Sequence, residues 1–370
     1  MKMFTRHVAS FLFLLLFAAC SSAPRFHVAP VPSYDACFDR EEGWTGADGA
    51  YTVALSGGRI LWLFGDTWIG KVRDNRHVEA TLVHNTVAIQ PEPELVCPQL
   101  RFFYSRSPEG MPKAVIRPKN GNGWLWMLDG VRTPEGLVVF MLQVEQTDAS
   151  SAFGFRTVGS WLGFVGNPEA LPAQWRIRQT AIPHAKLSEN GDLVFGAAVL
   201  KEDGFIYIYG TKEHMIRGRR GKSLVLARVP ETDVRDFDRW LFFSGGSWVA
   251  DVARAESLAN GMANECSVSY LTPLEQYALV YTENGCSRNF LLRLAPRPWG
   301  PWGDPILLYQ CPEMERDPNL FCYAAKAHPE LSADEAELIV TYIASATDFQ
   351  KLIDDAELYR PRFLKVRFEE

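Results

Sequence analysis

Apolar and β-branched residues along this chain come in short runs, and the runs come in pairs separated by a few turn residues. Inside the runs, apolar positions alternate with polar ones or follow one another without a break, and both patterns are typical of β-strands. A helical period is almost absent beyond residue 44. Five strand–turn–strand units can be distinguished, and their second strands begin near Ile60, Leu137, Phe205, Tyr277 and Leu338.

These second strands follow one another at intervals of 77, 68, 72 and 61 residues. Each interval has room for further strands, such as HNTVAIQ and RFFYS after the first unit. The last unit is short of strands, and both LKVRF near the C-terminus and residues near Val28 to Phe38 are candidates to complete it. A loose repeat of this size with about four strands per unit is typical of propeller blades. The pattern predicts an all-β fold, a five-bladed β-propeller, with a two-sheet sandwich as the alternative.

The N-terminal segment departs from this pattern. Lys2 and Arg6 precede the apolar run Phe11–Phe17, which is too short to span a bilayer and is typical of a secretory signal. The following LFAAC resembles a bacterial lipobox, in which Cys20 is lipidated and becomes the mature N-terminus; a plain signal peptide cut near Ala23 is the alternative.

Three segments are predicted from these features. Residues 1–19 form a lipoprotein signal peptide, residues 20–36 a lipidated N-terminus with a Pro-rich tether, and residues 37–370 the propeller. Ser21 after the cysteine resembles the outer-membrane sorting pattern. We therefore expect a lipid-anchored protein of the bacterial cell envelope, on the outer membrane.

Composition narrows the possible partners. Of 370 residues, 47% are hydrophobic and 22% charged, which is ordinary for a globular protein and argues against disorder. Lys and Arg total 38 against 44 acids, a net charge of −6, so there is no electrostatic case for a nucleic-acid partner. Aromatic residues reach 12%, with 11 Trp, more than a core usually needs; sugar-binding grooves are one destination for the surplus. We expect a monomer.

Seven cysteines are present, and Cys20 is assigned to the lipid. An even number remains in an exported chain without any C-x-x-C pair, which favours disulfides over metal. Cys266 and Cys286 flank a hairpin and Cys311 and Cys322 close a short loop, so these two pairs are predicted locally. Cys37–Cys97 follows by elimination.

The topology also predicts where two acids lie. In a propeller blade, the start of the innermost strand and the end of its neighbour meet at one face. If Ser56–Arg59 is the turn of the first hairpin, residue 55 lies opposite 60 and residue 48 opposite 67. Asp48 and Asp66 then reach the same mouth of the ring, although strict alternation would point them to opposite sides. Their convergence requires a bulge or a loss of pairing at the strand end.

Several catalytic devices are missing from the sequence. There is no G-x-S-x-G elbow, the seven His show no paired metal-ligand spacing, and GRRGKS (Gly218 to Ser223) lacks the first glycine of a phosphate loop. We predict no cofactor and no metal. Carboxylates and aromatic residues remain, which is the equipment of glycoside cleavage, in which one acid protonates the leaving oxygen and a second activates water or attacks.

LWLFGDTWIG (Leu61 to Gly70), preceded by DGAYTVAL, resembles the blade-one signature of a five-bladed propeller family long classed as of unknown function. Characterised members of that family are endo-D-arabinanases. Further segments match in order over most of residues 40–346: HNTVAIQ, WLWMLDGV, ECSVSYL, PWGPWGDPILLY and AHPELS. The resemblance implies a hydrolase of α-linked D-arabinofuranose polymers, with Asp48 and Asp66 as its catalytic pair.

Other polar and aromatic residues near the expected mouth, or matching the family pattern, are candidate contacts for a polysaccharide substrate. They are Asp129, Glu265, His84, Asn85, Trp68, Trp126, Glu213, Arg288 and His328. Each can also be structural: Asp48, Asp66 and Asp129 as turn acids, and His84 and Asn85 as packing groups. Trp62 is expected in the core. The alternative function is a non-catalytic glycan-binding or envelope-scaffold propeller, which has no need of two facing carboxylates.

Overall fold

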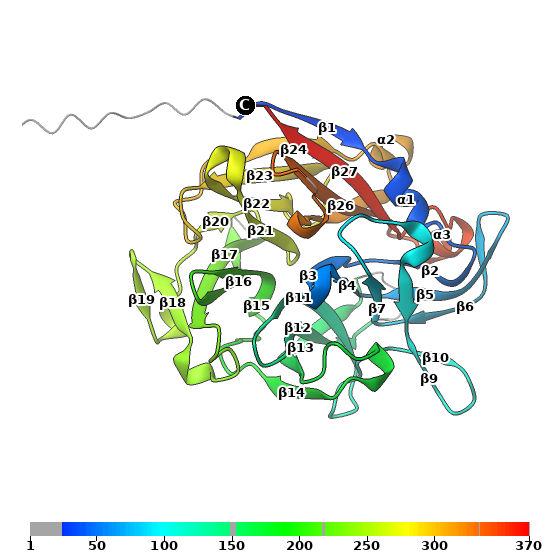
Figure 1. Ribbon diagram of the computed structural model, residues 1–370, viewed down its shortest axis with the longest axis horizontal. Coiled ribbons are helices and arrows are strands. Elements are labelled where there is room, and N and C mark those ends of the chain that lie inside the picture. Colours follow the sequence, from blue (N-terminus) through cyan, green and yellow to red (C-terminus); the bar gives the residue numbers. More distant parts are fainter. Residues whose placement is uncertain (1–23, 149–152, 217–218, 333, 370) are drawn as a thin grey trace, which may run out of the picture.

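Five antiparallel sheets are arranged around a common axis and form a five-bladed β-propeller (Figure 1). The computed structural model describes residues 24–148, 153–216, 219–332 and 334–369. The innermost strand of each blade contacts the innermost strand of a neighbouring blade, so these strands line the axis. The predicted all-β propeller is confirmed, and the two-sheet sandwich is wrong.

In every blade the strands follow one another from the axis outward. Blade one consists, in this order, of β3 (Tyr51–Ala54), β4 (Ile60–Phe64), β7 (Thr86–Gln90) and β8 (Arg101–Phe103). Blade two consists of β11 (Trp124–Arg132), β12 (Leu137–Gln146), β13 (Phe155–Val165) and β14 (Ile177–Ala181). Blade three consists of β15 (Leu193–Glu202), β16 (Phe205–Ile216), β17 (Arg219–Pro230), β18 (Leu241–Ser244) and β19 (Ser247–Val249), with the short β20 (Ala259–Asn260) beside β17. Blade four consists of β21 (Cys266–Leu271), β22 (Gln276–Thr282), β23 (Asn289–Ala295) and β24 (Ile306–Gln310). Blade five consists of β25 (Leu320–Ala327), β26 (Glu337–Ala346), β27 (Pro361–Phe368) and β1 (Phe26–Pro30).

The second strand of each blade starts within one residue of its predicted position. These strands are continuous apolar runs because neighbouring blades cover both of their faces; all five residues of β4 are buried. Trp62 on β4 lies in the core as expected, and its indole N–H donates to Gln90 Oε1 at 2.9 Å.

The ring closes through its two termini. β1 pairs antiparallel with β27, with Val28 opposite Val366, so the N-terminal strand is the outermost strand of the C-terminal blade (Figure 1). The helix α1 (Pro32–Phe38) follows and buries Phe38. The predicted ring closure is confirmed. The boundary predicted at residue 37 is wrong, because the propeller already includes Phe26, and a deletion that preserves the fold has to stop before it.

Blade one carries an additional three-stranded sheet, which is separate from the five blade sheets. It consists of β2 (Glu42–Ala47), β5 (Thr67–Arg73) and β6 (Arg76–Val83). β2 leads into β3 and β5 follows β4. The β2–β5 pair therefore continues the ribbon formed by β3 and β4 beyond the end of that ribbon. Other elements of the fold are the hairpin of β9 (Ser105–Arg106) and β10 (Pro112–Lys113) and the short helices α2 (Glu313–Arg316) and α3 (Phe349–Asp354). The sequence pattern did not predict the inserted sheet.

Two of the three predicted disulfides are present. Cys37 in α1 bonds to Cys97, and Cys311 bonds to Cys322. The predicted Cys266–Cys286 bond is wrong, because both are free thiols. Cys266 pairs with Tyr281 at the end of β21 and is buried among apolar side chains, whereas Cys286 lies in the exposed turn beyond β22.

Peptide mapping should recover the two disulfides and two free thiols. In the native protein we expect an alkylating reagent to label Cys286 at once and Cys266 only after unfolding, because only Cys286 is exposed. Reduction should also lower the melting temperature, since closing a loop as long as that between Cys37 and Cys97 typically contributes about 2–4 kcal/mol. Recovery of a linked Cys266–Cys286 peptide would contradict this assignment.

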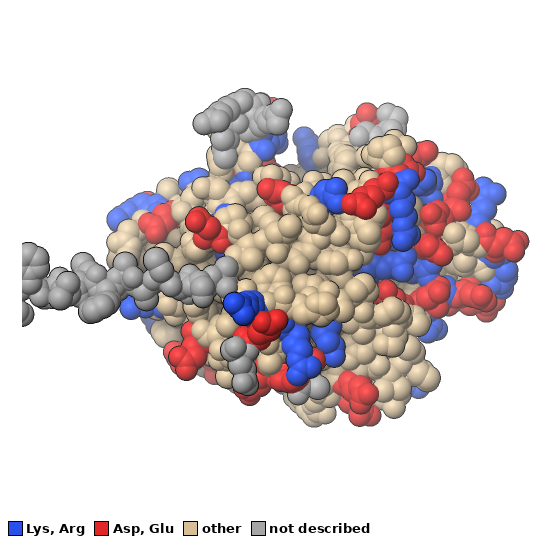
Figure 2. All heavy atoms as spheres, turned by 90° about the horizontal axis from the view of Figure 1, so that it is seen from above, with Lys and Arg blue, Asp and Glu red and all other residues tan. Residues whose placement is uncertain are grey.

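The surface reflects the composition. On the face shown in Figure 2, basic and acidic side chains are interspersed, and neither sign forms a continuous field. In the described part of the chain, no helix has the length and apolar character needed to cross a membrane. The lipobox and Cys20 lie outside the described residues.

Candidate active site

Asp48 and Asp66 meet where the β3–β4 ribbon leaves blade one for the inserted sheet. The last pair of the β3–β4 ribbon in blade one is Tyr51 with Leu63, and the nearest pair of the inserted sheet is Ala47 with Thr67. In the gap between them, the Asp48 N–H donates to Asp66 O at 3.2 Å, and the Gly65 N–H donates to Asp48 O at 3.0 Å. The two acids therefore sit opposite each other at a kink in one ribbon.

The predicted register was one residue off. The turn has three residues, Ser56–Gly58, and the Leu55 N–H donates to Arg59 O, so 55 lies opposite 59 and not 60. With this shift Asp48 lies opposite Asp66 itself. The predicted loss of pairing at the strand end is also present.

Two glycines make this approach possible. Gly49 has φ 77°, a left-handed conformation that L side chains rarely adopt, and Ala50 continues the bend with φ 57°. Across the ribbon, Asp48 Oδ1 occupies the space that a Cβ on residue 65 would need, so any residue larger than Gly65 would displace the carboxylate.

Asp48 is surrounded by hydroxyl donors and other acids. Its Oδ2 accepts from the hydroxyls of Tyr323 at 2.7 Å and Tyr359 at 2.8 Å. Burial, and then the charges of Asp66 and Glu265, raise the pKa of Asp48 to about 8, against the lowering effect of the two tyrosines. At neutral pH Asp48 therefore carries a proton.

Asp66 faces nitrogen donors instead. Its Oδ1 lies 2.9 Å from His84 Nδ1 and 2.9 Å from Trp126 Nε1. A carboxylate can only accept here, so His84 Nδ1 bears the hydrogen. The His84 ring is stacked on Trp124 with centroids 4.4 Å apart, which fixes its orientation. Both N–H donors converge on Oδ1 of Asp66 and hold its carboxyl group in one orientation.

Glu265 completes an acidic trio. It directly precedes β21, at the same face as Asp48, and its Oε1 lies 3.2 Å from the ammonium of Lys326. Asp48, Asp66 and Glu265 thus lie at one mouth of the ring, where His84 and Trp126 hydrogen-bond to Asp66.

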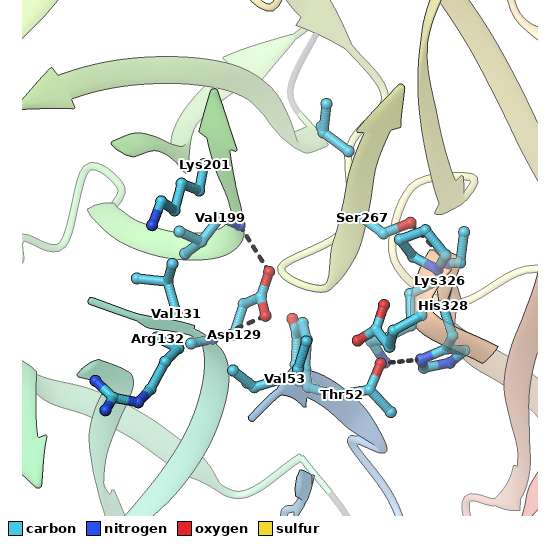
Figure 3. A pocket seen from close by; sticks show the side chains of 17 residues that line it. Thr52, Val53, Asp129, Val131, Arg132, Val199, Lys201, Ser267, Lys326 and His328 are labelled. Carbon is cyan, nitrogen blue, oxygen red and sulfur yellow. Dashed lines mark hydrogen bonds between the residues drawn. The ribbon is translucent and has the colours of Figure 1, made fainter. Parts of the chain in front are cut away.

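Asp129 lies elsewhere. It lies at a bulge inside β11, and its carboxylate accepts from the backbone N–H groups of Gly130 at 2.7 Å and Val199 at 2.6 Å (Figure 3). It lines a cavity of about 300 Å³ whose wall includes the later residues of the inner strands, toward the other mouth of the ring. Burial raises the pKa of Asp129 to about 8. Its carboxylate connects blades two and three.

Three predicted sugar contacts have structural roles. Asn85 is fully buried and its amide bonds to backbone groups of Ile116 and Leu125. His328 is fully buried between the hydroxyls of Thr52 and Thr341, each at 2.6 Å from a ring nitrogen, and burial lowers its pKa well below the usual range.

Trp68 is the third of these residues. It lies on β5 of the inserted sheet, is 5% exposed and stacks on His77 with centroids 5.0 Å apart. A buried ring cannot offer its face to a sugar, so the predicted stacking role is wrong.

Glu213 and Arg288 are engaged away from the acidic trio. Glu213 forms ion pairs with Lys222 at 3.3 Å and Arg220 at 3.6 Å within blade three. Arg288 pairs with Glu315 of α2 at 2.5 Å. Their contacts supply no argument for a sugar site, and their role in binding stays a prediction.

Sequence reasoning missed Tyr323, Tyr359 and Lys326. The two tyrosines carry no sequence signal, because their role depends on blade five closing against blade one. Lys326 could have been found, since it is a lone charge in the otherwise apolar and aromatic run FCYAAKA of β25.

Metal ligands are scarce. Among the described residues, Cys311, Glu313 and Cys322 lie close enough together to share an ion, but both sulfurs are joined in a disulfide.

The protein is therefore a five-bladed β-propeller in which the carboxyl groups of Asp48, Asp66 and Glu265 lie together at one end of the axis. The chain matches the family described as a domain of unknown function, DUF5005, over residues 32–368, and it belongs to that family. The family's description names no activity. A search of the curated proteins found no match.

Solved structures share the fold. A candidate hydrolase from Bacteroides ovatus is 21% identical, with a TM-score of 0.73, over 92% of this chain and 90% of that one. A thermostable family-43 glycoside hydrolase is 14% identical, with a TM-score of 0.47, over 90% and 92% of the two chains. An endo-arabinase from Bacteroides thetaiotaomicron is 10% identical, with a TM-score of 0.44, over 88% and 96%. The first likeness supports the propeller fold, and the other two are too distant to carry an argument.

Proposed function

We propose that this protein is a glycoside hydrolase in which Asp48 is the general acid and Asp66 the second carboxylate. The observation that carries the proposal is the contrast between two facing acids. Asp48, with its pKa raised to about 8, holds a proton at neutral pH, and Asp66 lies opposite it with Oδ1 accepting from the N–H groups of His84 and Trp126. Two carboxyl groups with divergent environments are the arrangement that glycosidases use.

The hydrogen bonds of the two carboxyl groups support a separate task for each oxygen. Asp48 Oδ2 is occupied by the two tyrosine hydroxyls, and no described residue hydrogen-bonds to Oδ1, which can carry the proton to the leaving glycosidic oxygen. Asp66 Oδ1 is held by His84 and Trp126, which leaves Oδ2 to attack the anomeric carbon or to activate a water molecule. A module that only binds glycans would have no use for this division.

We propose D-arabinofuranosyl polymers as the substrate class. The proposal is supported by the resemblance of LWLFGDTWIG to the endo-D-arabinanase signature, and Asp66 lies within that segment. The half-buried ring of Trp126, set edge-on to Phe155 with centroids 4.7 Å apart, is an aromatic wall next to Asp66 that suits the C–H face of a sugar.

Incubation with a panel of glycans tests this function. D-arabinan should release oligosaccharides, whereas L-arabinan and a pyranoside polymer such as xylan should not. Binding of D-arabinan without cleavage would favour the non-catalytic alternative. Cleavage of a different glycan alone would keep the hydrolase and refute the substrate.

We further propose that the propeller is held at the outer membrane by a lipid on Cys20, as the lipobox-like LFAAC suggests. The propeller would then act on polysaccharide in the envelope or at the cell surface. Cys20→Ala should abolish palmitate labelling and release the protein from the membrane fraction. Unchanged labelling of that variant would refute the lipoprotein assignment.

A further inference from the structure

Lys326 is a buried cation next to the acidic trio. Its side chain is 1% exposed. The ammonium donates to Ala324 O at 2.8 Å, to Glu265 Oε1 at 3.2 Å and to Gly49 O, and it lies 4.4 Å from the centre of the Tyr51 ring. A lysine has three N–H donors, and all three are used. Burying an ammonium is costly unless it is paired and hydrogen-bonded, so this set of partners is what allows the charge to remain there.

These partners belong to two parts of the acidic site. Gly49 directly follows Asp48 in the left-handed bend that turns the acid toward Asp66. Glu265 comes from blade four, and its negative charge is one of the causes that raise the pKa of Asp48. The ammonium of Lys326 on blade five therefore fixes the backbone of Gly49 next to Asp48. The same ammonium holds the carboxylate of Glu265, whose charge acts on Asp48.

We propose that Lys326 is a positioning residue for the acidic site: it fixes the Asp48–Gly49 segment, and its ammonium holds the Glu265 carboxylate in place and offsets part of the charge of that carboxylate. This inference rests on the proposed function. Lys326 touches neither Asp48 nor Asp66 directly, so its effect passes through Gly49 and Glu265. Lys326 also interacts electrostatically with the titratable groups of Asp129, Cys266 and His328.

Two variants of this pair should shift the pKa of Asp48 in opposite directions. Lys326→Met removes a positive charge and leaves the charge of Glu265 uncompensated, so the pKa of Asp48 should rise by about one unit. Glu265→Gln removes a negative charge, so the pKa of Asp48 should fall. Lys326→Arg keeps the charge and should leave that pKa close to the wild-type value. A residue that serves only as packing would produce none of these shifts.

The measurement is a carbon-13 NMR titration of aspartate carboxyl groups in the full chain, with the Asp48 signal identified by its loss in Asp48→Asn. The matched control is Lys201→Met, which removes another lysine that lines the cavity beside Asp129 and is paired with Glu231. It should leave the Asp48 titration unchanged.

Activity is the second readout. If D-arabinan is cleaved, Lys326→Met should lower kcat by about 10²-fold with little change in KM, since a displaced acid impairs the chemical step more than binding. If no glycan is cleaved, the proposed function fails, but the NMR titration still tests Lys326.

The inference is overturned if folded Lys326→Met and Glu265→Gln both titrate like the wild type. If Lys326→Met does not fold, Glu265→Gln and Lys326→Arg decide the matter. A fall in the Asp48 pKa with Glu265→Gln and a near wild-type value with Lys326→Arg would support the inference, and any other pair of results would refute it.

Discussion

Asp48→Asn and Asp66→Asn should each lower kcat on a cleaved glycan by about 10²–10⁴-fold, the usual contribution of a positioned proton transfer or its partner. An amide at residue 48 has no acidic proton to give to the leaving oxygen. An amide at residue 66 can neither attack the anomeric carbon nor take a proton from water.

Neither change should disturb the fold. In Asp48→Asn the amide oxygen can still accept from Tyr323 and Tyr359, and in Asp66→Asn it can still accept from His84 and Trp126. Circular dichroism and melting curves should therefore match the wild type. Asp354→Asn, which removes an exposed carboxylate that pairs with Arg76 on the outside of the molecule, is the matched control and should keep full activity. If either active-site variant keeps full activity, the assignment of the pair is wrong.

The strands of this fold could be predicted from the sequence because each blade repeats the same pattern of apolar runs and turns. The ring closure was also foreseen, since the last unit lacked strands that only the termini could supply. The inserted sheet was missed because β2, β5 and β6 mix polar and apolar residues, and because β5 and β6 lie between segments already assigned to blade one. The error on Trp68 followed from that omission, because its stacking partner His77 belongs to the same sheet.

The sequence predicted that Asp48 and Asp66 lie at the same mouth of the ring, but it did not predict the exact strand register that brings them face to face. Gly57 and Gly58 both have positive φ, and a pair of glycines is equally compatible with a two-residue and a three-residue turn. The three-residue turn shifts the pairing by one position, and only then do Asp48 and Asp66 face each other. The partners of Asp48 were beyond prediction, because Tyr323 and Tyr359 are separated from it by 275 and 311 residues.

Asn85 shows a further limit of sequence reasoning. A sequence motif shows only that an asparagine is present. It does not show whether the side-chain amide binds a sugar hydroxyl or the backbone. Only the burial of Asn85 and its bonds to Ile116 and Leu125 separate the two cases.

The pH dependence of kcat/KM should have an alkaline limb near pH 8, because the free enzyme loses the proton of Asp48 there. Above that pH the value should fall by about tenfold per unit. The hydroxyls of Tyr323 and Tyr359 donate to the charged form of Asp48 and so hold its pKa lower than burial alone would. Tyr323→Phe and Tyr359→Phe remove these donors while keeping the rings, so each should raise the pKa of Asp48 and move the limb to higher pH.

The size of this displacement follows from the strength of the bonds that are lost. A hydrogen bond to a charged group contributes about 1.5–3 kcal/mol and one pKa unit corresponds to about 1.4 kcal/mol, so each variant should move the limb by about one to two units. Tyr309→Phe, in a half-buried tyrosine that stacks on Phe290 in blade four, is the matched control and should leave the profile unchanged. Asp66→Asn should instead lower the pKa of Asp48, since it removes the negative charge with the largest effect on that pKa. The titration of Asp48 in this variant has to be followed by NMR, because the variant is expected to be nearly inactive. A limb that stays in place or moves to lower pH in both tyrosine variants would show that the group titrating near pH 8 is not Asp48, and the general acid would then have to be sought at Glu265.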